Sequence, residues 1–255
     1  MDITNVAAVI TGATGGIGKA TAVAFLEAGA GAVGLLARNT ERLGALTEEL
    51  TGAGYGERIV PLLADLQDHT ALDVAFADFV ARTGRIDVLV NNAAVMLDGA
   101  MYFPSQGDDE FYPMESWNTT LASNLTGPFR CAQLAVKHMA EAKTQGVIVN
   151  LTSISRHGQA GQAAYSTTKG GIVSLTLSLA QELAPMHIRC VAVSPGLVET
   201  KMSASIPPVH RKRLLKKVPV GRMATPEEVA HAIRFCVEND YFNGAVLDLD
   251  GGMKE

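Results

Sequence analysis

A tyrosine and a lysine stand four residues apart, Tyr165 and Lys169, in a segment with the pattern of a helix. This spacing puts a phenol and an ammonium on one helical face, one turn apart. A phenol with an ordinary pKa of about 10 is a weak acid-base group at neutral pH. A lysine charge beside it stabilises the phenolate, so we expect Lys169 to lower the pKa of Tyr165. Such a pair could move a proton to or from a substrate oxygen.

Two further features accompany this pair. Ser153 directly follows a short apolar run, and the glycine-rich turn Thr11–Gly18 joins an apolar run to a helical pattern near the N-terminus. Gly12 permits a tight turn, while Gly16 and Gly18 let the backbone approach a pyrophosphate. The start of the helix supplies free amides and a partial positive charge. The combination predicts an enzyme with a nucleotide cofactor; a glycine turn that binds nothing is the open alternative.

The end of the second apolar run indicates which cofactor is preferred. In many NAD sites an acid at this point holds the ribose 2′-hydroxyl. Here Ala37 stands in that place and Arg38 follows it. The missing carboxylate removes repulsion toward a 2′-phosphate, and a guanidinium can bind that phosphate bidentately. We therefore expect NADP(H) rather than NAD(H), with a solvated charge at a strand end as the alternative for Arg38.

Composition excludes several classes of protein. A chain of 255 residues that is 47% hydrophobic fits one globular domain with a substantial core. A formal net charge of −5 gives no reason to expect nucleic-acid binding. No apolar run reaches the length of a membrane span, and the N-terminus lacks the regions of a signal peptide. We expect a cytoplasmic protein without membrane contact.

Cysteines and histidines give no sign of a disulfide framework or a metal. The three cysteines, Cys131, Cys190 and Cys236, are far apart in apolar surroundings, which is typical of reduced thiols in a core. The six histidines are scattered without metal-ligand spacing. The Gly-x-Ser-x-Gly pattern of a hydrolase is also absent from the sequence. We expect no bound metal.

Short apolar runs alternate with helical patterns along the chain. We expect strands at Val6–Thr11, Ala32–Ala37, Arg58–Leu63, Ile86–Val90, Val147–Thr152, Ile188–Ser194 and Ala245–Leu249. We expect helices near Ile17–Ala28, Thr40–Thr51, His69–Thr83, Met114–Ala140, Ala164–Leu183 and Pro226–Glu238. This alternation predicts an α/β fold: a single Rossmann-like domain, with a doubly wound, mainly parallel sheet of about seven strands flanked by helices.

Two long segments interrupt the alternation, Met96–Tyr112 and Thr200–Val220. Long loops near strand ends of such a sheet usually build the substrate pocket. The second segment contains a basic run, although the chain as a whole is net acidic. Five cations fall within seven consecutive residues of it: Arg211, Lys212, Arg213, Lys216 and Lys217. These cations could attract an acidic carrier of the substrate; a solvated helix face is the alternative.

Over nearly the whole chain these residues resemble the short-chain dehydrogenase/reductase family. The glycine turn resembles its coenzyme turn, Asp65 its adenine contact, and Asn91–Ala94 its Asn-Asn-Ala-Gly segment. Ser194–Thr200 resembles the segment that holds the nicotinamide carboxamide. The catalytic tetrad of the family is matched by Asn124, Ser153, Tyr165 and Lys169.

Within that family the second half most resembles the type-2 3-hydroxyacyl-CoA dehydrogenases, in stretches such as Gly161–Ser166 and Leu183–Arg189. Those enzymes carry an acid at the end of the second strand and use NAD(H), whereas this chain has Ala37 and Arg38. Its Leu249–Met253 stretch resembles bacterial 3-oxoacyl-carrier-protein reductases instead.

The resemblance implies hydride transfer between a nicotinamide and a secondary alcohol or ketone, possibly a 3-hydroxyacyl or 3-oxoacyl thioester on CoA or acyl carrier protein. It implies that Tyr165 transfers the proton, Ser153 holds the oxygen, Lys169 binds the ribose, and Asn124 holds a water that continues the proton path. It also implies a coenzyme half near residues 1–150, a catalytic half near 151–255, and a homotetramer built through the helices near 114–140 and 164–183.

The expected cofactor contacts are Gly12, Thr14, Gly16, Ile17, Gly18, Arg38, Asn39, Asp65, Leu66, Asn92, Ala93, Tyr165, Lys169, Pro195, Gly196, Val198 and Thr200. Other substrates stay open, namely a small free ketone, a steroid or a polyketide-type molecule. So do a dehydratase or epimerase on this fold and a non-catalytic regulator that binds the cofactor, although such a regulator should lack part of the tetrad.

Overall fold

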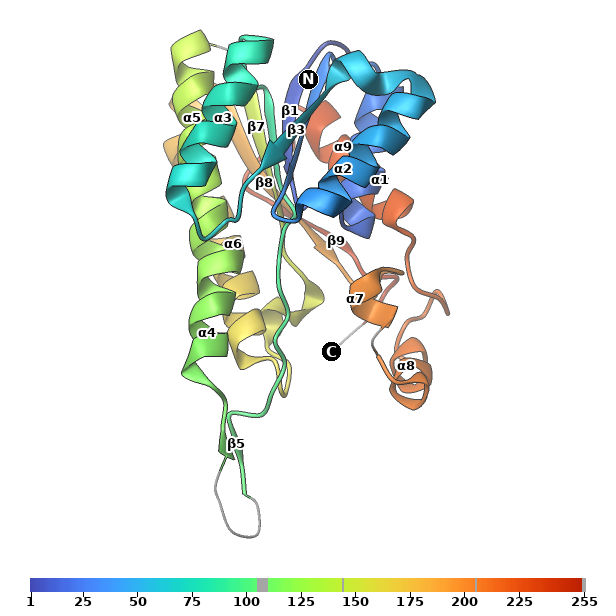
Figure 1. The fold of residues 1–255 in the computed structure, drawn as a ribbon. Coiled ribbons are helices and arrows are strands. Elements are labelled where there is room, and N and C mark those ends of the chain that lie inside the picture. Colours follow the sequence, from blue (N-terminus) through green and yellow to red (C-terminus); the bar gives the residue numbers. More distant parts are fainter. Residues whose placement is uncertain (105–109, 144, 205, 254–255) are drawn as a thin grey trace.

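The computed structural model describes residues 1–104, 110–143, 145–204 and 206–253 (Figure 1). Its sheet contains β1 (Ala7–Thr11), β2 (Ala32–Ala37), β3 (Ile59–Leu63), β4 (Val88–Asn91), β7 (Gly146–Leu151), β8 (Ile188–Pro195) and β9 (Val246–Leu249). The strand order is β3-β2-β1-β4-β7-β8-β9, and every neighbouring pair is parallel. The predicted doubly wound sheet is confirmed, with its order reversing between β1 and β4.

Helices cover both faces of this sheet (Figure 1). One buried cluster joins the sheet to α1 (Gly16–Glu27), α2 (Thr40–Leu50) and α9 (Pro226–Glu238). A second cluster joins it to α3 (His69–Thr83), α5 (Gly127–Ala142) and α6 (Ala163–Glu182). Because both faces are covered, central strands such as β1 and β7 are buried throughout. This explains why they are continuous apolar runs in the sequence.

Side-chain caps fix where several helices begin. Asn39 accepts a hydrogen bond from the amide of Arg42 at the start of α2, and Asp68 accepts one from Ala71 at the start of α3. Thr225 and Glu228 form a reciprocal capping box at the start of α9. Such caps satisfy amides that the first turn of a helix leaves without a partner.

The structure corrects two expectations about continuous elements. The helix expected at Met114–Ala140 consists of α4 (Met114–Leu121), a π-helical turn at Ala122–Thr126, and α5. The supposed loop Met96–Tyr112 contains an antiparallel hairpin of β5 (Tyr102–Phe103) and β6 (Glu110–Phe111). Residues 105–109, and with them Asp108 and Asp109, lie outside the described residues.

The segment Thr200–Val220 also contains helices, α7 (Lys201–Ala204) and α8 (Pro208–Leu215). Short helical turns occur at Thr51–Tyr55, Gly56–Arg58, Ile154–His157 and Ala184–Met186. These irregular parts were missed because their hydrophobic patterns are too short to show a period.

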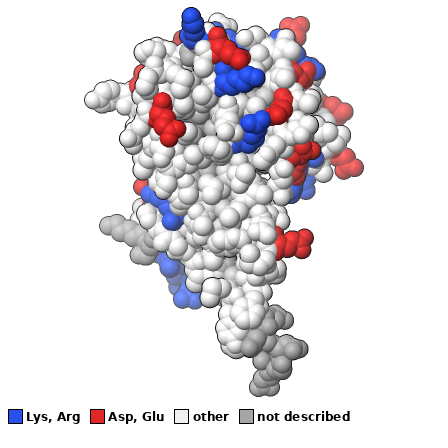
Figure 2. Space-filling view, turned by 90° about the vertical axis from the view of Figure 1, so that its left-hand side faces the viewer, with Lys and Arg blue, Asp and Glu red and all other residues white. Residues whose placement is uncertain are grey.

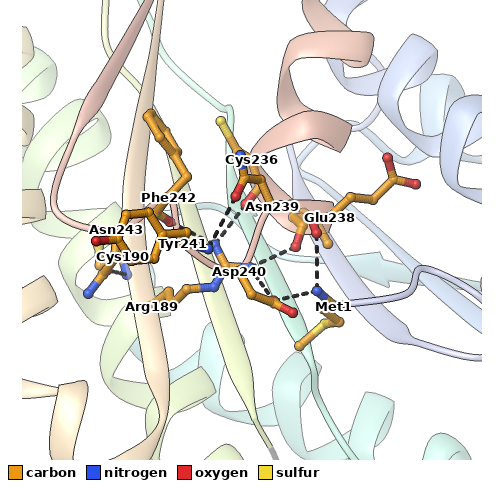
Figure 3. Close-up of polar contacts among 11 residues, drawn as sticks. Met1, Arg189, Cys190, Cys236, Glu238, Asn239, Asp240, Tyr241, Phe242 and Asn243 are labelled. Atoms are coloured by element: carbon orange, nitrogen blue, oxygen red, sulfur yellow. Dashed lines mark hydrogen bonds and ion pairs between the residues drawn. The ribbon is translucent and has the colours of Figure 1, made fainter.

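The end of α9 is fastened to β8 by Arg189 (Figure 3). Its guanidinium donates to the carbonyls of Cys236 (2.8 Å), Val237 (2.7 Å) and Phe242 (2.9 Å). The last carbonyls of a helix lack partners within the helix, so this side chain satisfies them. Asp240 accepts from both Arg189 and the Met1 ammonium, which joins the chain's start to the same point.

All three cysteines are buried and free. None of the helices in the described ranges is long and apolar enough to span a membrane.

Candidate active site

Ser153, Tyr165 and Lys169 come together where β7 ends and α6 begins. Ser153 precedes the 3-10 turn Ile154–His157, and its hydroxyl accepts a hydrogen bond from the amide of Ser155 (3.2 Å). Lys169 is buried, and its Nζ donates to the carbonyl of Leu151 (2.6 Å). That ammonium lies over the Tyr165 ring, 5.6 Å from the ring centroid. The helical spacing therefore stacks the two side chains as the sequence predicts.

The electrostatic expectation for Tyr165 does not hold in the protein alone. Burial raises the pKa of Tyr165 to about 12; a hydrogen bond with Ser153 lowers it and the charge of Asp98 raises it. Burial also lowers the pKa of Lys169 to about 8. Both shifts favour the neutral form, because removing a charge from water is costly. The largest cause of the raised Tyr165 pKa is therefore burial, rather than the charge of Lys169.

Asn124 lies in the π-helical turn between α4 and α5 and is buried. Its side-chain oxygen accepts from the amide of Val95 (2.8 Å), and its side-chain nitrogen donates to the carbonyl of Val95 (2.7 Å). The amide thus binds the backbone of the segment that follows β4. Its expected role in a proton path stays a prediction.

The glycine turn packs against the segment after β4. Gly12 has φ +65°, and a Cβ there would lie 2.8 Å from Cα of Ala93. A Cβ on Gly18 would lie 2.3 Å from the carbonyl oxygen of Gly12. Asn92 donates to the carbonyls of Thr11 (2.9 Å) and Gly12 (3.2 Å) and so closes the turn. These contacts require glycine at both positions.

The start of α1 fits a bound phosphate group. Within the described residues no side chain caps this helix, and its first turn holds no acidic residue. This contrasts with the capped helices α2 and α3. Uncapped amides at a helix N-terminus, behind a glycine turn, form a site for a pyrophosphate. Thr14, Gly16 and Ile17 lie at this helix start.

The other expected cofactor residues lie at the same edge of the sheet. Arg38 and Asp65, which follow β2 and β3, form an ion pair at 3.6 Å, in which Arg38 is exposed and Asp65 is partly buried. Asn39 caps α2 through its side-chain oxygen. A Cβ on Gly16 would lie 3.2 Å from Thr200, so the segment after β8 reaches the glycine turn. The remaining members lie at the end of β8 or shortly after the ends of β3, β4 and β8: Leu66, Ala93, Pro195, Gly196 and Val198.

Four side chains near this site have no role predicted from the sequence, and they form two pairs. Gln162, just before α6, donates to Asp98 (2.9 Å) in the segment that follows β4. Arg156, three residues after Ser153, makes two hydrogen bonds to Asp248 in β9, at 2.8 and 3.2 Å. The only sequence feature that could have pointed to Gln162 is its position three residues before Tyr165.

Within the described residues no group of His, Cys, Asp or Glu could hold a metal ion.

A doubly wound sheet with a glycine turn and a Ser-Tyr-Lys set at its carboxyl edge defines a class of oxidoreductase. A family model described as enoyl-(acyl carrier protein) reductase matches residues 12–254. The chain belongs to the short-chain dehydrogenase/reductase family, as its motifs predict.

Curated relatives align along nearly the full chain. The subunit BbsD of (2S)-[(R)-hydroxy(phenyl)methyl]succinyl-CoA dehydrogenase from Thauera aromatica is 36% identical, over 99% of this chain and 98% of its own length. The 3-oxoacyl-[acyl-carrier-protein] reductase FabG of Thermotoga maritima is 35% identical, over 96% of each chain. Human 3-hydroxyacyl-CoA dehydrogenase type-2 is 35% identical, over 97% of this chain and 94% of its own. The two groups predicted from the motifs are both present.

Proposed function

We propose that this protein transfers a hydride between NADP(H) and the 3-position of a 3-hydroxyacyl or 3-oxoacyl thioester. The relatives named above act on acyl groups carried by CoA or acyl carrier protein. The observation that carries the proposal is the Tyr165 phenol beside Ser153, with the ammonium of the buried Lys169 over its ring, at the sheet edge that holds the uncapped start of α1.

The nicotinamide, when bound, supplies or accepts the hydride. The chain's own residues manage the proton. Tyr165 donates it to the substrate oxygen in reduction and removes it in oxidation. Ser153 hydrogen-bonds the same oxygen and fixes its position. Lys169 holds positive charge close to the ring, and Asn124 keeps the segment after β4 in place.

The raised pKa of Tyr165 suits reduction. A phenol with a pKa of about 12 is protonated at neutral pH, so it is ready to donate to a developing alkoxide. Oxidation needs the phenolate instead. We therefore infer that reduction is the favoured direction near neutrality, and that kcat/KM for oxidation rises steeply with pH above neutrality while that for reduction does not.

Preference for NADP(H) is proposed from the end of β2. Ala37 offers no carboxylate there, and the exposed guanidinium of Arg38 lies at the same sheet edge as the glycine turn. A 2′-phosphate would take over the place of Asp65 as partner of Arg38.

The carrier is proposed from α8. Its cations Arg211, Lys212 and Arg213 are followed by Lys216 and Lys217, and four of the five side chains are exposed. A carrier with phosphates or an acidic surface would be attracted to this helix. A small free ketone would gain nothing from it.

Assembly into a homotetramer is proposed through the side of the molecule that carries α4, α5 and α6. Figure 2 shows this side, where most charged side chains lie in the upper half and the middle of the surface below them is white, with a few charged side chains at its left and right edges. Between Ala163 and Gln181, the one charged residue of α6 is the buried Lys169.

The buried free thiols fit a reducing compartment, so we infer a cytoplasmic location.

The direct test follows nicotinamide absorbance with acetoacetyl-CoA, an acetoacetyl acyl carrier protein and a panel of free ketones, each with NADPH and with NADH. Turnover of a thioester with NADPH supports the proposal. Absence of turnover with every substrate would favour a dehydratase, an epimerase or a regulator on this fold.

A further inference from the structure

Two hydrogen-bond acceptors belong to residues near Tyr165: the side-chain oxygen of Gln162, which directly precedes α6, and the carboxylate of Asp98, whose charge acts on the phenol. Gln162 Nε2 donates to the carboxylate of Asp98 (2.9 Å) and to the sulfur of Met96 (3.4 Å). An ionised carboxylate only accepts hydrogen bonds, so the amide nitrogen must face Asp98 and the amide oxygen must face away. That oxygen, Gln162 Oε1, is buried and has no hydrogen-bond partner among the residues that the structure describes.

Backbone hydrogen bonds hold the segments that carry Asp98 and Gln162 in place. Val95 is bonded through both its amide and its carbonyl to Asn124. Four residues later the amide of Gly99 donates to the carbonyl of Gly161 (2.8 Å). The segment 95–99 therefore runs from the π-helical turn to the loop before α6. Gln162 directly precedes that helix, which carries Tyr165.

The two acceptors favour one kind of group and exclude another. A buried carbonyl oxygen without a donor costs free energy, which a ligand N–H or O–H would recover. Asp98 adds an exposed negative charge next to that oxygen. The charge acts at the catalytic phenol, since it contributes to the raised pKa of Tyr165. A neutral ligand with an N–H is therefore favoured there, and a carboxylate is repelled.

Resting on the proposed function, we propose that Asp98 and Gln162 form the subsite for the arm of the substrate beyond its reacting carbon. This subsite accepts an amide N–H of a thioester arm and excludes the carboxylate of a free 3-oxo acid. The enzyme thereby selects carrier-bound 3-oxoacyl groups over the same acids in free form.

The experiment uses three acceptors of one acyl group. Acetoacetyl-N-acetylcysteamine is a neutral thioester with an amide N–H, ethyl acetoacetate is neutral without one, and acetoacetate is an anion. kcat/KM with NADPH is measured at low salt for the wild type, Asp98→Asn and Gln162→Met. Asp78→Asn, a partly exposed acid of α3 paired with Arg82, is the matched control. Circular dichroism and NADPH affinity establish that each variant is folded.

For each protein the ratio of kcat/KM between two substrates is taken, and comparing this ratio between variant and wild type cancels the different intrinsic reactivity of the substrates. Asp98→Asn should raise the acetoacetate-to-ester ratio on the order of five- to tenfold, because one like-charge repulsion is removed. Gln162→Met should lower the thioester-to-ester ratio roughly fivefold, the effect of one hydrogen bond. Unchanged ratios in both variants, with the wild type active on ester and thioester, overturn the subsite alone. A wild type that reduces none of the three overturns the proposed function and the subsite together.

Discussion

The ammonium of Lys169 lies over the ring of Tyr165, 5.6 Å from its centroid, while donating a hydrogen bond to the carbonyl of Leu151. The lysine is thus held by the end of β7 rather than by the phenol oxygen. Both groups are desolvated, and both have a pKa displaced toward the neutral form. The spacing on α6 places the two groups together, and their burial decides which protonation state each of them favours.

Replacing Tyr165 with phenylalanine should leave the fold and the NADPH affinity intact and remove most turnover. Only the transferable proton is lost, and general acid-base catalysis contributes about 10²–10⁴-fold. Single-turnover reduction, followed at the nicotinamide band, measures the effect. A near-wild-type rate in this variant would exclude Tyr165 from the mechanism.

Lys169→Met should change how stability depends on pH. In the wild type the folded-state pKa is lowered to about 8, whereas an unfolded lysine titrates near about 10.4. Between these values the unfolded chain binds more protons, so wild-type stability rises with pH across this window. Relative to Lys169→Met, the wild type should gain up to about 3 kcal/mol between pH 8 and 10.5.

Urea unfolding at several pH values measures that difference. Lys137→Met, an exposed lysine of α5, is the control for removing a lysine from the surface. If the difference between wild type and Lys169→Met is flat across the window, Lys169 is not desolvated as the structure indicates.

Arg38→Ala should weaken NADPH binding and spare NADH. One charge-assisted contact to a phosphate is lost, worth on the order of 1.5–3 kcal/mol, or roughly ten- to a hundredfold in Kd. Calorimetric titration of both cofactors measures it. Arg82→Ala, which removes an exposed arginine of an ion pair on α3, is the matched control. Equal losses for the two cofactors would show that Arg38 only supports its loop through Asp65.

The basic helix α8 should make carrier-bound substrates sensitive to salt. Charges attract mainly during encounter, and salt screens them over a Debye length of about 8 Å at physiological ionic strength. kcat/KM for acetoacetyl-CoA and for the acyl carrier protein form should fall with salt more steeply than for an uncharged ketone. Neutralising Lys212 and Lys216 should flatten that difference, whereas neutralising Arg82 and Lys137 should not. Identical salt profiles in the wild type would favour a small free ketone as substrate.

The sequence by itself determined the parts of this protein that follow from local rules. Apolar runs and helical periods predict where the strands and helices lie along the chain, and the glycines mark the turn after β1. The spacing of Tyr165 and Lys169 puts them on one face of α6 as soon as that helix forms. Each of these features depends on residues that are close in the chain.

Only the tertiary structure decided the contacts between distant residues. Asn124 binds Val95 across 29 positions, Gln162 binds Asp98 across 64, and Arg156 binds Asp248 across 92. The direction of the Tyr165 pKa shift belongs with them, because burial depends on everything packed around a side chain. Periodicity does not encode which loops meet or how much water they exclude, so these properties arise only when the sheet brings its strand ends to one edge.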